Sequence, residues 1–340
     1  MIERTQLAPG YEISRVIKGG WQLAQGHGKR AAADPVADMF AFAERGIDTF
    51  DCADIYTGVE DAIGRFNAAR AAPPVRVHTK YVPDYDELAS LSKSRVEARV
   101  DRSLRRLRRE RLDMLQFHWW NYDIPGWLET ARWLQELQEA GKIELLSLTN
   151  FNSATSRALL EAGVRLASTQ VQYSLLDPRP EKSLTALCRR HGMQLLCYGT
   201  LAGGFLSERW LGASKPRAPE NRSLVKYLLI IEEIGGWALF QELLAALEQI
   251  ARRHDTDIAS VASRWVLDRA QVAAVIIGAR NADHLDRYSE LFRIALDDAD
   301  RARIDTLRRK MRAPDLDVFD LERDKSGRHG RIMRYDLSAN

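Results

Sequence analysis

Two residues that could take part in proton transfer follow a short apolar run early in the chain. The run over residues 47–51 is rich in β-forming side chains and predicts a buried strand. Asp51 ends this run, and Tyr56 follows five residues later. A carboxylate and a phenol at a strand end are groups that a proton-donating site needs. An aspartate at this place could equally cap the next helix, so the pair alone leaves both interpretations open.

Two further strand ends carry side chains that would complete such a site. The alternating segment 75–80 ends in Lys80, and segment 113–118 ends in His118. A phenol with a pKa near 10 is a poor donor at neutral pH, but a neighbouring ammonium lowers that pKa. We therefore expect Asp51 to hold Lys80 charged and in place, and Lys80 to make the phenol more acidic. The imidazole of His118 would hydrogen-bond a carbonyl oxygen, or share the phenol's proton at lower pH.

Each of these residues also has an ordinary structural explanation. Lys80 could be a surface lysine, Tyr56 an aromatic at the rim, and His118 a buried histidine with its hydrogen bonds satisfied. The three residues nevertheless end neighbouring predicted strands, and this coincidence favours a shared site.

The elements that must position these side chains alternate strictly between strand and helix. Eight strands are predicted near residues 16, 48, 76, 115, 145, 170, 195 and 275, with helices between them. Over this length the pattern is typical of α/β proteins with a (β/α)8 TIM barrel, whose strands carry catalytic groups at their C-terminal ends. A doubly wound sheet is the alternative, but no Gly-x-Gly-x-x-Gly motif follows the first strand. We expect a single domain over residues 1–340, with the barrel over about 10–295 and an additional helix and tail over 296–340.

Local signals refine this outline in a few places. Asp34-Pro35 predicts a helix start, because proline is favoured at the first helical position. Residues 297–311 predict the additional helix, and residues 201–237 are expected to form a long irregular excursion. The charged tail 312–340 is expected to pack loosely or to drape over one face of the barrel.

Composition limits the possible partners. The chain is 45% hydrophobic and 29% charged with a formal net charge of +3, a balance that does not favour nucleic-acid binding. It contains no apolar run of membrane-spanning length, and the start lacks a signal-peptide pattern, so we expect a cytoplasmic protein without a membrane partner. The three cysteines form no Cys-x-x-Cys pair, which favours a reducing compartment and no metal site. The oligomeric state is left open.

Asp51, Tyr56, Lys80 and His118 together resemble the catalytic tetrad of the aldo-keto reductase superfamily, and the similarity extends over roughly residues 10–310. The resemblance implies a nicotinamide cofactor and further site residues. Thr149 and Asn150 lie in a segment similar to the family's Val-Ser-Asn-Phe, which holds the nicotinamide amide together with Gln170. Tyr198 matches the tyrosine that stacks on the nicotinamide ring. The remaining cofactor residues implied are Leu201, Gly203 and Gly204 along the pyrophosphate, and Gly278, Arg280, Asp283 and His284 around the adenosine phosphate.

Some positions depart from the family pattern. Thr149 replaces a serine and keeps its hydroxyl, whereas Thr169 replaces an asparagine, which leaves Gln170 as the secure amide ligand. Tyr288 stands where an adenine-binding asparagine is common. Large aromatics at a barrel mouth often serve only packing, but we expect Trp21 and Trp119 to face the substrate.

The expected function is the NADPH-dependent reduction of an aldehyde or ketone, reversible as alcohol or sugar oxidation. Hydride would come from the nicotinamide and the proton from Tyr56, with NADH a less favoured cofactor than NADPH. Two alternatives remain open, a non-catalytic subunit that senses the cofactor and a redox-neutral isomerase on the same barrel. The small-molecule carbonyl or sugar substrate depends on loops near 21–30, 119–126 and 205–236 and on the tail.

Overall fold

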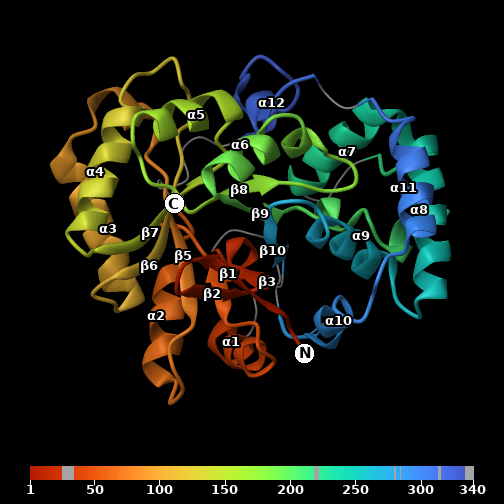
Figure 1. The fold of residues 1–340 in the computed structure, drawn as a ribbon, viewed down its shortest axis with the longest axis horizontal. Helices are drawn as coiled ribbons and strands as arrows, with labels where there is room; N and C mark the ends of the chain where they lie inside the picture. Colours follow the sequence, from red (N-terminus) through yellow and green to blue (C-terminus); the bar gives the residue numbers. More distant parts are fainter. Residues whose placement is uncertain (25–33, 218–221, 279–280, 284, 313–314, 334–340) are drawn as a thin grey trace.

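A closed barrel of eight parallel strands forms the centre of the structure (Figure 1). The structure, a computed structural model, describes residues 1–24, 34–217, 222–278, 281–283, 285–312 and 315–333. The barrel strands close in the order β10-β3-β4-β5-β6-β7-β8-β9. Their bounds are β3 (Val16–Gly19), β4 (Thr49–Asp51), β5 (Arg76–Tyr81), β6 (Leu112–Phe117), β7 (Ile143–Thr149), β8 (Ser168–Gln172), β9 (Gln194–Tyr198) and β10 (Val272–Gly278). All eight predicted strands and the barrel are confirmed.

Helices follow the strands and surround the barrel, as Figure 1 shows. One or more helices follow each barrel strand, and two further helices lie in the C-terminal part. They are α1 (Pro35–Glu44), α2 (Val59–Ala69), α3 (Lys93–Leu107), α4 (Trp127–Glu139), α5 (Ser153–Glu161), α6 (Leu184–His191), α7 (Arg222–Ile234), α8 (Gly236–Arg253), α9 (Ile258–Leu267), α10 (Leu285–Glu290), α11 (Asp298–Arg308) and α12 (Asp320–Arg323). The local predictions hold at α1, where Asp34 caps the backbone amides of the first turn, and at α11, which begins with a capping box at Asp297.

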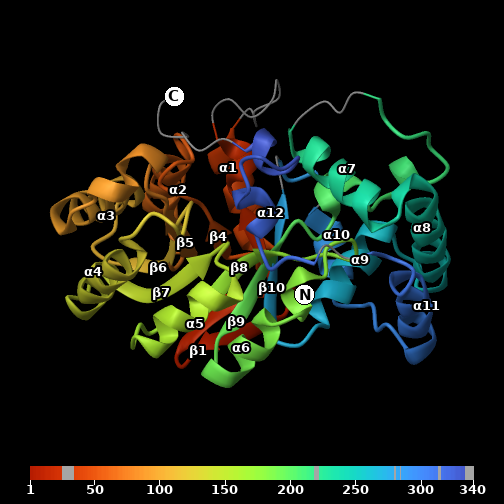
Figure 2. The ribbon, with the colours of Figure 1, turned by 90° about the horizontal axis from the view of Figure 1, so that it is seen from above.

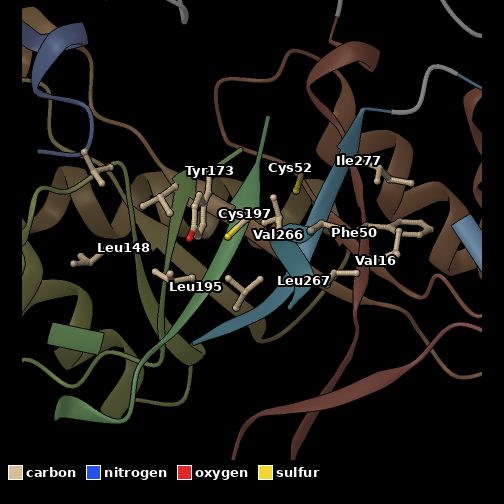
Figure 3. Packing of buried hydrophobic residues seen from close by; sticks show 14 of the residues in the cluster. Val16, Phe50, Cys52, Leu148, Tyr173, Leu195, Cys197, Val266, Leu267 and Ile277 are labelled. Carbon is tan, nitrogen blue, oxygen red and sulfur yellow. The ribbon is translucent and has the colours of Figure 1, made fainter. Parts of the chain in front are cut away.

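Two apolar cores hold these layers together. The larger core lies between the outer faces of the strands and the surrounding helices, and Figure 3 shows part of it, from Val16 and Phe50 to Leu148 and Leu195. The smaller core fills the N-terminal end of the barrel interior and includes Ile17, Met114 and Leu196. Burial of this much apolar surface is the main stabilising contribution to such a barrel.

A hairpin that the sequence interpretation missed closes the N-terminal end of the barrel. Strands β1 (Arg4–Ala8) and β2 (Tyr11–Ser14) pair antiparallel, and Leu7, Tyr11 and Ile13 pack into the smaller core. The turn between them contains Pro9-Gly10, an ordinary turn signal. The hairpin therefore covers the N-terminal end of the barrel, opposite the end where barrel enzymes bind their ligands.

The expected irregular excursion over residues 201–237 was wrong in its second half, where α7 forms. Tyr227, Leu228, Ile231 and Ile234 are buried at helical spacing, so an amphipathic pattern was present in the sequence. Between Gly204 and the start of α7, the described residues contain one short 3₁₀ turn, Glu208–Trp210.

The tail drapes over the C-terminal end of the barrel, as one of the two expectations had it, but it does not pack loosely. Phe319, Glu322 and His329 are buried, and Asp317 and Asp320 bond the start of α5. In Figure 2 the red β1 and the blue α12 lie on opposite sides of the strands. No helix within the described ranges is both long and apolar enough to cross a membrane.

Candidate active site

Three strand ends bring the predicted tetrad together at the C-terminal end of the barrel. Lys80 Nζ donates to both carboxylate oxygens of Asp51 at 2.7 Å and to the backbone oxygen of Cys52 at 2.8 Å. The same nitrogen lies 5.2 Å from the centre of the Tyr56 ring. Asp51, Lys80 and His118 are 4%, 4% and 3% exposed, whereas Tyr56 is only partly buried. Tyr56 is therefore the tetrad residue with the largest exposed fraction.

Two glutamines complete the surroundings of the carboxylate. Gln116 Nε2 and Gln170 Nε2 donate to Asp51 Oδ1 at 2.9 and 2.6 Å, and Gln170 Nε2 also donates to Gln116 Oε1 at 2.9 Å. Gln170 was expected at the nicotinamide amide; its nitrogen faces Asp51, and its Oε1 makes no hydrogen bond in the described part of the chain. Gln116 was not predicted. A signal was present, because Gln116 stands two residues before His118 and so shares its face of the strand.

Burial dominates the acidity of the phenol. Desolvation raises the pKa of Tyr56 to about 12, although the neighbouring Lys80 acts to lower it. Lys80 thus acts on the Tyr56 pKa in the expected direction, but the pKa as a whole is raised rather than lowered as predicted. Burial also acts to lower the pKa of Lys80, but its interactions with Asp51, Tyr56 and Cys52 together outweigh burial, and the pKa is raised. Tyr56 is protonated and Lys80 charged at neutral pH.

The imidazole of His118 has a defined tautomer. Its Nδ1 lies 3.1 Å from the backbone oxygen of Thr149, and a carbonyl oxygen only accepts, so Nδ1 carries the proton. Burial and the positive charge of Arg323 lower the pKa of His118 to about 3. The ring is neutral at physiological pH, and Nε2, which has no partner among the described residues, is an acceptor. In this form His118 cannot donate a hydrogen bond from Nε2 to a carbonyl oxygen, contrary to the expectation.

A buried ion pair holds the loop that carries Tyr56. Asp54 accepts from Arg99 Nε of α3 at 2.6 Å and from the backbone amide of Val82 at 3.3 Å. Desolvation raises the pKa of Asp54 to about 6, with Arg99 opposing the shift. Just after β3, Gly20 packs so closely that a Cβ atom there would lie 2.6 Å from the backbone oxygen of Asp51. The sequence interpretation identified neither constraint.

The residues expected around the nicotinamide amide offer a suitable set of polar groups. Thr149 Oγ1 is buried without a partner among the described residues, and Gln170 Oε1 makes no hydrogen bond within the same part of the chain. An amide group needs one donor and one acceptor, and a hydroxyl with a glutamine oxygen can supply both. Asn150 has φ of 60°, a left-handed conformation that asparagine tolerates well, and its Oδ1 accepts from Tyr198 at 2.9 Å. This end of the proposed cofactor site fits a carboxamide.

In the segment expected along the pyrophosphate, packing within the protein explains the glycine at position 203. Gly203 has φ of +68°, and a Cβ atom there would lie 2.8 Å from the Tyr227 ring of α7. Leu201 and Gly204 flank it in the same turn. Close packing against α7 and backbone conformation therefore account for Gly203 without a ligand.

The adenosine end is described only in part. Gly278 ends β10 and is exposed, and Asp283 accepts from Asn281 at 2.6 Å. Arg280 and His284, which were expected to bind the phosphate, lie outside the described residues.

The two tryptophans expected to face the substrate lie in different environments. Trp21 is partly buried, and its ring centre lies 5.0 Å from that of Tyr56, next to the tetrad. Trp119 is 0% exposed, packs on Phe117 and donates its indole N–H to the backbone of the following loop. The structure therefore places Trp119 in the core, because its polar group is satisfied within the chain and no surface remains for a substrate.

The C-terminal segment covers this end of the barrel. Phe319 lies 5.7 Å from the His118 ring, edge to face, and Arg323 donates to the backbone oxygens of Trp119 and Asn150 at 3.0 and 2.6 Å. Glu322 is buried and accepts from Arg179 at 2.9 and 3.1 Å. The tail is thus part of the wall around the tetrad, which its charged composition did not predict.

Comparisons with known proteins agree with this geometry. The chain is 26% identical over 318 residues to the aldo-keto reductase YhdN of Bacillus subtilis, covering 90% of this chain and 93% of the relative. It is 27% identical over 305 residues to flagellar radial spoke protein 5 of Chlamydomonas reinhardtii, covering 78% of this chain but only 55% of that longer protein. It is 26% identical over 238 residues to the NADH-specific methylglyoxal reductase of Escherichia coli, covering 68% of each.

A solved structure extends the similarity to three dimensions. The glycerol dehydrogenase AKR11B4 of Gluconobacter oxydans superposes with a TM-score of 0.75 at 25% identity, over 90% of this chain and 95% of that one. The sequence matches the Aldo/keto reductase family over residues 15–309. The chain therefore belongs to the aldo/keto reductase family, oxidoreductases that act on carbonyl groups with nicotinamide cofactors.

Proposed function

We propose that this protein reduces an aldehyde or ketone with NADPH, and that Tyr56 donates the proton to the carbonyl oxygen. The observation that carries the proposal is the buried Asp51–Lys80 pair, whose ammonium lies 5.2 Å from the Tyr56 ring. A phenol with a pKa near 12 is fully protonated at neutral pH, and the ammonium beside it stabilises the phenolate left after proton transfer.

The other residues have supporting roles in this proposal. Asp51 keeps Lys80 charged and oriented, and a bound reduced nicotinamide supplies the hydride. His118 orients the substrate as a hydrogen-bond acceptor in its neutral form, so a substrate with a hydroxyl beside its carbonyl would satisfy Nε2. Trp21 provides an apolar wall next to Tyr56.

The choice of NADPH over NADH rests on Arg280. This residue follows the last barrel strand, where barrels commonly bind phosphate, and a guanidinium suits the 2′-phosphate that only NADPH carries. An ion pair between Arg280 and Asp283 at the surface is the competing explanation. The E. coli relative is named as NADH-specific, so the family match does not decide the choice.

The proposed substrate is a small carbonyl compound or sugar. The tail lies against His118 and the loop after β6, and the side chains of these segments would select the substrate. The proposed setting is the cytoplasm, where the three buried cysteine thiols would stay reduced.

A turnover assay tests the proposed function. Purified protein is mixed with NADPH or NADH and a panel of aldehydes, ketones, hydroxyketones and sugars, and the loss of reduced-nicotinamide absorbance is followed. We expect consumption with at least one carbonyl class and faster turnover with NADPH than with NADH. Binding of cofactor without consumption on any substrate would favour a sensing subunit. Substrate conversion without net cofactor consumption would favour an isomerase.

A further inference from the structure

Gln116 lies at the centre of a hydrogen-bond network that the tetrad does not account for. The side chain is 0% exposed on β6, and Gln170, its partner on β8, is 4% exposed. Together with Lys80 they surround one oxygen of Asp51 with three donors, at 2.7, 2.9 and 2.6 Å. Buried amides placed this closely to a carboxylate and to each other have few alternative arrangements.

The chemistry of the carboxylate fixes which way each amide points. An ionised carboxylate only accepts hydrogen bonds, so both glutamines must turn their nitrogens toward Asp51. Gln116 then presents Oε1 on its other side, and this oxygen accepts the second hydrogen of Gln170 Nε2 at 2.9 Å. Both hydrogens of Gln170 are therefore committed, one to Asp51 and one to Gln116. A rotated Gln170 amide would bring two acceptor oxygens to face each other.

One atom of Gln170 is left for a ligand. Its Oε1 has no hydrogen-bond partner in the described part of the chain, and it can only accept. In the same set of groups, Asn150 Oδ1 is already occupied by the hydroxyl of Tyr198. The acceptor that remains suits an N–H group, such as that of a carboxamide.

We propose that Gln116 is a positioning residue that holds Gln170 with its oxygen toward the carboxamide of a nicotinamide cofactor. This inference rests on the proposed function, because it requires that the site bind such a cofactor. Gln116 itself would touch neither cofactor nor substrate. Asp51 already turns the nitrogen of Gln170 toward itself, and the second bond, to Gln116, keeps the amide from pivoting about the first, so that Oε1 stays directed at the carboxamide.

Cofactor analogues separate this role from a merely structural one. The 3-acetylpyridine analogue of NADP⁺ keeps the carbonyl but replaces the amide nitrogen with a methyl group, so it has no N–H to donate. Wild-type protein should bind NADP⁺ about tenfold more tightly than the analogue, because the analogue loses one hydrogen bond and leaves Gln170 Oε1 without a donor. Dissociation constants are measured by quenching of tryptophan fluorescence, a readout that does not depend on turnover.

The test variant is Gln116→Met, which keeps the length and removes both hydrogen-bonding groups. Gln170 would then be held by Asp51 alone and could pivot about that one hydrogen bond, so the preference for NADP⁺ over the analogue should fall to about threefold or less. Ser147→Ala is the matched control, because Ser147 is also buried, on the neighbouring strand, but its hydroxyl bonds Ser168 and the Met114 sulfur rather than Asp51 or either glutamine. Its preference should equal that of wild type. Gln116→Asn, which keeps the amide, is made in parallel and should retain more of the preference than Gln116→Met.

The outcomes distinguish this inference from the proposed function. An unchanged preference in Gln116→Met, or a wild type that binds NADP⁺ and the analogue equally, would overturn the role of Gln116 and leave the reductase proposal standing. The second of these results needs no variant, so a Gln116→Met protein that fails to fold does not remove the test. Absence of binding of any nicotinamide cofactor to the wild type would overturn both proposals together.

Discussion

Replacing Lys80 with methionine should strongly destabilise the protein, because it leaves a carboxylate buried without its counter-ion. The side chains of Lys80 and Asp51 are 5% and 6% exposed, and the ammonium touches both carboxylate oxygens at 2.7 Å. Removing one partner of a buried ion pair typically costs about 3–5 kcal/mol, far more than the pair itself contributes. The two glutamine donors remain on Asp51 and should keep the loss within that range.

A matched surface pair shows what the burial contributes. Lys142 Nζ contacts Asp101 at 2.6 Å, as closely as the buried pair, but these side chains are 39% and 37% exposed. Lys142→Met should therefore cost about 1 kcal/mol or less. Replacing both Asp51 with asparagine and Lys80 with methionine removes the uncompensated charge, so the double variant should be more stable than Lys80→Met alone.

Urea unfolding followed by tryptophan fluorescence measures these differences. The free energies of unfolding of the wild type, the three variants and Asp51→Asn give the coupling between the two buried residues. Equal losses for Lys80→Met and Lys142→Met would refute the reasoning from burial. A double variant less stable than Lys80→Met would show that the loss does not come from the unpaired carboxylate.

Three further predictions concern other parts of the molecule. Burial lowers the pKa of His78 to about 3, so the unfolded state binds more protons than the folded state between pH 3 and 6.5. The free energy of unfolding therefore decreases as the pH falls through this window. His78→Met should reduce this decrease by about 1.4 kcal/mol per pH unit, measured by urea unfolding at pH 5 and 7. Arg280→Ala should weaken NADPH binding by about 1.5–3 kcal/mol and leave NADH binding nearly constant in fluorescence titrations, whereas equal losses would rule out phosphate selection. Glu322→Gln should destabilise the protein by about 3 kcal/mol or more, because the buried Arg179 loses a charged partner. The tail should then be cut more readily in limited proteolysis, and an unchanged digestion pattern would contradict the view that this ion pair holds the tail in place.

The barrel could be predicted because its signals are local. Several strands are short apolar or alternating runs, and turn or capping residues such as Asp34-Pro35 mark where the helices begin. The tetrad could be predicted for the same reason, since strand ends of a parallel barrel meet at one end whatever the helices do. The motif spacing around Asp51 and Tyr56 then identified the family, which the comparisons confirmed.

The features that escaped prediction depend on contacts between distant segments. Gln116 gained its place only when β4, β6 and β8 came together around Asp51. Trp119 was expected at the mouth, but its position after His118 did not reveal that the next loop folds over it. Whether the tail would pack loosely or drape over the barrel stayed open, because Glu322 looks like an ordinary surface charge until Arg179 lies beside it. The direction of the Tyr56 pKa shift likewise could not be predicted from the neighbouring lysine alone, because it also depends on how deeply the hydroxyl is buried.

Tyr56→Phe tests the central claim most directly, because it removes one hydroxyl and keeps the ring that lies against Trp21 and Lys80. The rate of hydride transfer is measured in single turnovers with saturating cofactor and the best carbonyl substrate from the panel, and cofactor affinity is measured separately by fluorescence. If Tyr56 donates the proton, the rate should fall by about two to four orders of magnitude while the dissociation constant of the cofactor hardly changes. A phenylalanine variant that turns over at nearly the wild-type rate would contradict the account.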